Sequence, residues 1–229
     1  MRNMLAILLQ ITETTVPVVP EAPPELSVAE LLMKGGIIMI PILLLLFVAT
    51  YFFIERYLYI RSVTRRNRDL IPNIKKHLQD GDVKSARLYA ERDNSAIGNI
   101  ISGGLDYVGK PIKDIETVME SAANIEIAEM EKNIGYLGII AGIAPMLGFI
   151  GTISGIIRIF YNISLSDNIS IGIIAGGLYE KMITSGSGLV VGVIAYSAYH
   201  LLQQKINRFS LQMQKDAFEF MRSILSPAK

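Results

Sequence analysis

Residues Asn133–Ile157 read NIGYLGIIAGIAPMLGFIGTISGII, a run of 25 residues without one charged side chain. At about 1.5 Å rise per residue, a helix of this length crosses the roughly 30 Å hydrocarbon core of a bilayer. Small residues and one hydroxyl recur along it at helical spacing: Ala141, Ala144, Gly148, Gly151, Thr152 and Gly155. Such a face lets helix backbones approach closely. The stretch therefore predicts a membrane-spanning helix that packs tightly against another helix.

Two further uncharged runs, Gly35–Ile54 and Met182–Gln204, are also long enough to cross a membrane. Hydrophobic residues make up 51% of the chain and charged residues 19%, and the mean hydropathy is +0.39. Three such runs in 229 residues indicate a polytopic membrane protein. The alternative, a soluble bundle with three buried helices, needs a larger polar shell than this composition supplies. Pro41 lies in the first run, and we expect it to kink that helix.

The residue types that are absent or rare limit the chemistry. The chain has no cysteine and only two histidines, His77 and His200, so it offers no thiolate nucleophile, disulfide framework or histidine-rich metal site. No nucleophile–base constellation appears either. A net charge of +1 gives no reason to expect nucleic-acid binding. We therefore expect neither an enzyme nor a bound cofactor or metal.

The basic residues set the expected orientation. Residues 55–132 contain 13 Lys and Arg, residues 158–181 contain two, and residues 205–229 contain five. By the positive-inside rule the long loop and the C-terminal tail are cytoplasmic and the N-terminus lies outside. Glu55 and Arg56, at the end of the first run, are interpreted as a membrane-edge anchor.

The predicted fold is an all-α membrane protein with three transmembrane helices per subunit and long cytoplasmic helical extensions. Its segments are a periplasmic N-terminal extension (1–27), a first transmembrane helix (28–60), a cytoplasmic helical region (61–132), a second transmembrane helix (133–160), a short periplasmic loop (161–171), a third transmembrane helix (172–204) and a cytoplasmic C-terminal helix (205–229). The apolar run near the N-terminus is either an interfacial helix or the core of a signal peptide.

Within the cytoplasmic region, turn residues at 80–81, 93–94 and 109–111 separate the expected helices. No glycine or proline lies between Ile112 and Gly135, so we expect the helix that starts there to continue straight into the second span. A tail helix over residues 205–225 extends the third span in the same way. The apolar stripes of such protruding helices need partners, which favours a homo-oligomer.

The third run carries a second polar pattern on two neighbouring strips. One strip consists of Glu180, Thr184, Ser187, Gly188, Val191 and Ala195, and the other of Lys181, Ser185, Gly192, Tyr196 and Tyr199. Hydroxyls gain nothing from facing lipid, so these strips face a protein interior or a wet pathway. For Thr152, Thr184 and Ser185, the alternatives are hydrogen bonds that join helices and a route for a proton or cation.

Two features near the membrane bear on such a route. For Glu180 and Lys181 there are two interpretations. They are a snorkelling pair at the membrane interface, or they have a function, as an entrance acid or a contact to a partner helix. No Asp or Glu lies deep inside any of the three runs, although proton pathways usually contain an ionisable group at depth. If the chain conducts protons, another chain must supply that carboxylate.

Three stretches resemble the ExbB/TolQ/MotA family. The run APMLGFIGTISGIIRIF (residues 144–160) resembles its second span, whose pattern is roughly A-P-x-x-G-L-L-G-T-V-x-G-I. Residues 180–189 are similar to its third span, and residues 35–56 to its first. Within the family, the N-terminal extension resembles ExbB more than TolQ, and three spans without a long torque domain differ from MotA.

The resemblance implies a pentamer around a central pore in the bacterial inner membrane. It also implies an ExbD-like single-span partner that supplies a proton-carrying aspartate, and a TonB-like protein that receives the energy for outer-membrane transport. By this resemblance Thr152 is the second-span hydroxyl, Glu180 the third-span acid, and Ser185, preceded by Thr184, occupies the position of the third-span threonine. Small residues complete the expected pore lining: Gly148, Gly155 and Gly188.

Three alternatives stay open at this stage. A TolQ-like subunit in envelope constriction has the same family pattern but a different client. A non-conducting membrane scaffold uses the polar strips only to hold helices together. Sodium is an alternative coupling ion, because hydroxyls and carbonyls suit either cation.

Overall fold

The computed structural model describes residues 35–65, 67, 69–165 and 171–225, and these form helices joined by short turns. The helices are α3 (Met39–Val63), α4 (Leu70–Gln79), α5 (Val83–Arg92), α6 (Ala96–Leu105), α7 (Ile112–Glu131), α8 (Ile134–Ser164) and α9 (Ile171–Leu225). The predicted N-terminal extension, the start of the predicted first helix (28–34), residues 166–170 of the predicted loop and residues 226–229 of the predicted tail lie outside the described residues.

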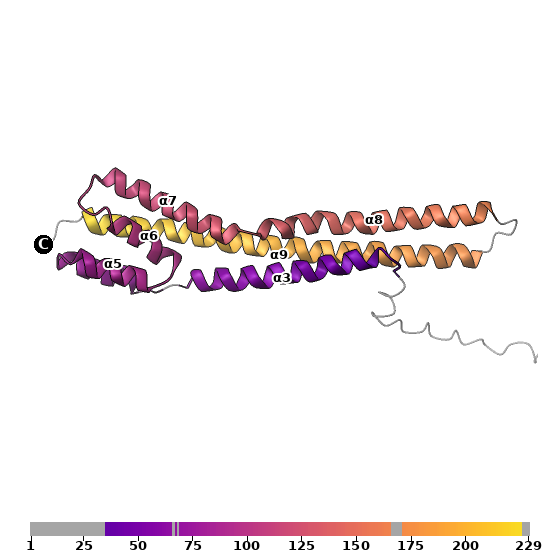
Figure 1. Cartoon of the computed structure of the whole chain (residues 1–229), viewed down its shortest axis with the longest axis horizontal. Coiled ribbons are helices and arrows are strands. Elements are labelled where there is room, and N and C mark those ends of the chain that lie inside the picture. Colours follow the sequence, from indigo (N-terminus) through magenta and orange to yellow (C-terminus); the bar gives the residue numbers. More distant parts are fainter. Residues whose placement is uncertain (1–34, 66, 68, 166–170, 226–229) are drawn as a thin grey trace, which may run out of the picture.

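Three helical stretches are long and apolar enough to cross a membrane: Met39–Val63, Ile112–Ser164 and Ile174–Ile224. In Figure 1, α3 and α8 lie alongside α9, which runs the length of the molecule. The predicted number of three candidate spans is thus confirmed. The chain is a multi-pass membrane protein built of helices.

Within the described residues, the first apolar run becomes helical at Met39. Gly36 has a φ of +74°, and its carbonyl accepts a hydrogen bond from the Met39 N–H at 3.1 Å. This turn precedes α3, which begins at Met39. Pro41 therefore falls in the first turn of α3, where the backbone N–H has no partner within the helix. The predicted proline kink in mid-span is wrong, because no helical hydrogen bond is lost there.

The predicted continuity between the cytoplasmic helix and the second span is also wrong. α7 ends at Glu131, and α8 begins at Ile134 after Asn133, whose φ of 63° is left-handed. Asparagine adopts this conformation at low cost among residues with a Cβ atom. The joint keeps Met130, Ile134 and Leu137 buried on both of its sides. A bend therefore occurs without the glycine or proline that usually signals one.

The third span and the tail form one uninterrupted helix, α9, of 55 residues, as the pattern predicted. Against its C-terminal half pack α4, α6 and α7, and α5 packs on α4 and α6. We call these four helices, together with residues 205–225 of α9, the head. The turns of the head occur where predicted, with positive φ at Gly81, Asn94 and Gly109.

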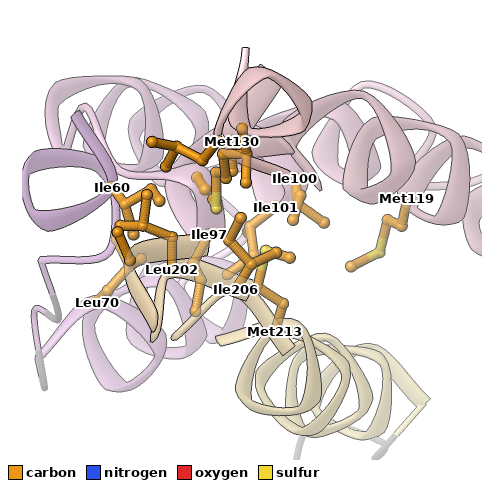
Figure 2. Packing of buried hydrophobic residues seen from close by; sticks show 14 of the residues in the cluster. Ile60, Leu70, Ile97, Ile100, Ile101, Met119, Met130, Leu202, Ile206 and Met213 are labelled. Carbon is orange, nitrogen blue, oxygen red and sulfur yellow. The ribbon is translucent and has the colours of Figure 1, made fainter. Parts of the chain in front are cut away.

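The head has a core of large aliphatic and sulfur-containing side chains. Figure 2 shows Ile97, Ile100 and Ile101 of α6 between α7 and α9. Leu202 and Ile206 of α9 reach the same cluster, and both are almost fully buried. Burial of each large side chain contributes about 1.5–3 kcal/mol to stability. This core therefore holds the C-terminal half of α9 in place.

Candidate functional site

Helices α8 and α9 meet backbone to backbone at Gly148 and Gly188. A Cβ atom added at Gly188 would lie 2.6 Å from the Ala144 carbonyl oxygen and 3.0 Å from the Gly148 Cα. At Gly192, an added Cβ would lie 2.6 Å from the Pro145 ring. The small-residue faces of both helices thus face each other within one chain, as the sequence predicted.

Thr184 joins two segments close to this crossing. Its hydroxyl lies 2.6 Å from the Gly35 carbonyl oxygen, just before α3, and 3.2 Å from the Glu180 carbonyl. The side chain is only 1% exposed. Because a hydroxyl has one proton to donate, the shorter contact to Gly35 is the stronger hydrogen bond. Thr184 therefore ties the start of α3 to α9.

Thr152 makes the corresponding link from α8. Its hydroxyl lies 3.2 Å from the Gly148 carbonyl, four residues earlier, and 3.2 Å from the Lys181 carbonyl of α9. The side chain is half-buried. Thr152 is therefore compatible with both alternatives from the sequence, a hydrogen bond between helices and a route for a proton or cation. It joins α8 to α9 through the Lys181 carbonyl, and water or a guest side chain can replace that carbonyl as its partner.

Ser185 differs from its neighbour Thr184. It is half-buried, and among the described residues no hydrogen-bond partner is found for its hydroxyl. It lines a shallow open cleft between α8 and α9 with Pro145, Met146, Phe149 and Leu189. Of the two hydroxyls at the third-span position, Ser185 is the one that a group outside the chain can reach.

Glu180 and Lys181 form an ion pair near the start of α9. The Lys181 Nζ lies 2.6 Å from Glu180 Oε1, and the lysine side chain is only 19% exposed. The lysine stem crosses α8 over Gly155, where an added Cβ would lie 2.1 Å from Lys181 Cγ. The pair borders a small polar cavity of about 190 Å³ that Arg158 and Gly36 also line. Gly155 is therefore the residue that admits the lysine.

The pair at the other end of α3 has partners inside the chain. Arg56 is 7% exposed, and its guanidinium donates to Glu55 at 2.5 and 2.6 Å and to the Glu129 carbonyl at 3.0 Å. That carbonyl belongs to the last turn of α7, where carbonyls lack helical partners and a positive charge is favourable. Arg56 thus connects α3 to the bend between α7 and α8.

The sequence profile of the MotA/TolQ/ExbB proton channel family matches residues 92–215, which include α8 and the polar part of α9. The chain belongs to this family. Its named relatives are of the ExbB and TolQ types, which supports an ExbB-type protein.

The relatives cover different shares of the chain. A putative biopolymer transport protein ExbB-like 1 of Synechocystis sp. is 27% identical over 74% of this chain and 68% of its own length. A putative ExbB homolog of Methanothermobacter thermautotrophicus is 28% identical over 79% of this chain and 64% of its own. The Tol-Pal system protein TolQ of Haemophilus influenzae is 30% identical over 42% of each. The chain thus spans about two thirds of the first two relatives.

Large apolar side chains are exposed on both α8 and α9 within the candidate spans. On α8, large side chains are exposed along the whole span: Ile139, Ile143, Met146, Phe149, Ile150, Ile153 and Ile157. On α9, Leu189, Val190, Val193 and Ile194 are exposed, opposite the strips that contact α8. Such surface suits lipid or further helices.

Sequence reasoning missed the backbone partners of the hydroxyls. The carbonyls of Gly35, Lys181 and Glu129 carry no side-chain signal, and each lies far along the chain from its donor. Gly155, which is expected to line the pore, lies under the Lys181 side chain within one chain, a contact that its spacing does not predict.

Proposed function

We propose that this chain is the channel-forming subunit of an ExbB-type motor driven by the proton motive force. Several copies, five by family resemblance, surround the single-span helices of an ExbD-like partner, and energy passes to a TonB-like protein for outer-membrane transport. In this proposal the chain lies in the inner membrane with its head in the cytoplasm. The observation that carries it is that Thr152 and Ser185 line the α8–α9 surface while its spans hold no acid at depth among the described residues.

The proposed division of labour follows from the geometry. The guest helix supplies the titrating carboxylate, and Thr152 and Ser185 supply hydroxyls that orient it or an ordered water. Thr184 is assigned to holding the start of α3, since its hydroxyl is already bonded to Gly35 at 2.6 Å. Gly148 and Gly188 set the spacing of the two helices, and Glu180 with Lys181 contacts the guest near one membrane surface.

Proton flux into vesicles that contain the chain and its acid-bearing partner tests these roles. Thr152→Val removes one hydroxyl and keeps the volume, and Ser185→Ala removes the other. We expect each to lower flux by about a hundredfold, the low end of typical proton-transfer contributions. Thr50→Val is the matched control, because Thr50 is exposed on α3 and only bonds back to the Leu46 carbonyl at 2.8 Å.

Unchanged flux in both variants would reject the hydroxyl roles. No flux in the wild-type complex would support a non-conducting scaffold instead. The same vesicles with a sodium gradient in place of a proton gradient decide the coupling ion.

A TolQ-type role is the second candidate, because TolQ of Haemophilus influenzae is the relative with the highest of the three identities, although over 42% of the chain. The two roles differ in the single-span protein that copurifies. An ExbD-like partner supports the transport role, and a TolR-like partner supports envelope constriction.

A further inference from the structure

A cleft between α3 and α9, near the head, has an apolar part. Phe53 and Tyr57 of α3 and Leu201 and Leu202 of α9 line it, and its volume is about 240 Å³. Leu201 is 60% exposed at its mouth. A helix with side chains is about 10–12 Å across, so this volume would hold only about 2–3 Å of its length, less than one turn. The cleft suits a narrow apolar chain better than a helix.

A larger and more polar cavity borders this cleft on the side of the head. The two parts share Lys205 and Arg208, and Arg65 and Asn67 also line the polar part, whose volume is about 590 Å³. Asp216 and Glu219 line it as well, but they lie two to three turns, or about 12–16 Å, farther along α9 than Arg208. The basic residues are thus the charges next to the apolar part.

Among the described residues, Arg65, Lys205 and Arg208 form no ion pair. The Lys205 Nζ instead lies 3.9 Å from the centre of the Tyr57 ring, which places the charge at the junction of the two parts. Three basic side chains that form no ion pair among the described residues, next to an apolar slot, are complementary to an amphiphile with an anionic head.

We propose that this cleft binds one anionic phospholipid from the leaflet on the side of the head. Its phosphate lies between Lys205 and Arg208, within reach of Arg65, and one acyl chain lies along Phe53, Tyr57, Leu201 and Leu202. The lipid fills the gap between α3 and α9 and so fixes their angle. This inference goes beyond the proposed function, because it requires only that the chain span a membrane.

Lipid retained by the purified full-length assembly tests the proposal. The assembly is exchanged through detergent micelles with equal phosphatidylglycerol and phosphatidylethanolamine, and bound lipid is counted by native mass spectrometry. We expect a strong preference for phosphatidylglycerol. Lys205→Gln with Arg208→Gln lowers its binding by about 25-fold, since each basic residue at an anionic surface contributes about fivefold.

The matched control carries Arg61→Gln with Lys132→Gln, which removes the same charge from exposed residues outside the cleft. We expect it to bind phosphatidylglycerol as the wild type does. Equal losses in the two double variants would overturn the site, because they would show a general surface attraction.

Two further variants separate the other occupants. Leu201→Trp fills the apolar part, and we expect it to lower the retention of phosphatidylglycerol while both basic residues remain. Displacement of the lipid by an equal concentration of glycerol phosphate would show a free-anion site and overturn the proposal. The chain has no native cysteine, so rapid disulfide formation between copies through Leu201→Cys would show a second copy in the cleft and overturn it too.

Discussion

The two halves of α9 pack by opposite means. In the membrane half, the residues buried against α8 are small: Thr184, Gly188, Val191, Gly192, Ala195 and Ala198. From Leu202 into the head, the buried apolar residues of the same helix are large: Leu202, Ile206, Met213, Phe220 and Met221. The periodicity continues unchanged, but the side-chain size reverses where the helix leaves the span.

The surrounding solvent explains this reversal. In water, burial of large apolar side chains drives packing, so the head places them inside. In lipid, a leucine gains little by leaving the acyl chains, so helices associate through close backbone contact and hydrogen bonds, and the large side chains face outward. The difference shows that one helix follows two packing rules, and it leaves the membrane half with surface for lipid and for other copies.

The largest expected effect comes from removing a large side chain in the head. Phe220 is fully buried, so we expect Phe220→Ala to lower the free energy of unfolding by about 3–5 kcal/mol. Phe218→Ala is the control, because Phe218 is 72% exposed, and it should change little. Urea unfolding in micelles, followed by circular dichroism, measures both. Equal effects at the two positions would show that burial of large apolar side chains away from water does not stabilise the head.

In the membrane half, we expect the addition of a side-chain atom, rather than its removal, to lower the stability. Gly188→Ala adds a Cβ 2.6 Å from the Ala144 carbonyl oxygen, and we expect a loss of about 2–3 kcal/mol from overpacking. Gly186→Ala on the same helix meets nothing within 4 Å and should be neutral or slightly stabilising. Unfolding in mixed micelles compares the two. A stable Gly188→Ala protein would contradict close backbone packing.

A smaller effect is expected at Arg56, which joins α3 to the end of α7. Arg56→Gln removes the donor to the Glu129 carbonyl, 3.0 Å away, and leaves Glu55 without its partner. We expect a loss of about 1.5–2 kcal/mol, as for a hydrogen bond from a charged group. Hydrogen exchange at the end of α7 should speed up. Arg61→Gln, an exposed change one turn or so away, serves as the control and should leave that exchange unaltered.

The smallest effect concerns a helix start in the head. Ser95 caps α6 by accepting from the Gly98 N–H at 3.1 Å, and Ser95→Ala should lower stability by about 1 kcal/mol. Ser95→Thr keeps the hydroxyl and should restore part of the loss. Thermal unfolding of the two variants checks this. An unchanged melting temperature for Ser95→Ala would mean that packing alone positions α6.

Much of this comparison was predictable from the sequence, because charge, small-residue spacing and turn residues are local signals. They located the three spans, the α8–α9 contact face and the turns at Gly81, Asn94 and Gly109. The bend at Asn133 was missed because asparagine only sometimes adopts a left-handed backbone. The expected kink at Pro41 depended on where the helix begins, which the sequence leaves uncertain by a few residues.

The candidate site was predictable in its residue types and less so in their partners. Spacing identified Thr152, Thr184 and Ser185, yet only the fold shows that Thr184 bonds Gly35, 149 residues away, while Ser185 stays open. The bond from Arg56 to Glu129 likewise joins residues 73 apart. Backbone carbonyls are present at every residue, so nothing in a sequence marks the one that a distant side chain will choose.

The central claim is that the chain supplies a hydroxylated surface and borrows its acid from a guest helix. Proton flux in vesicles measures this most directly, with the chain alone, with its single-span partner, and with that partner's membrane aspartate changed to asparagine. The account predicts flux only in the second case. Equal flux from the chain alone, or from the complex with the asparagine partner, would contradict it.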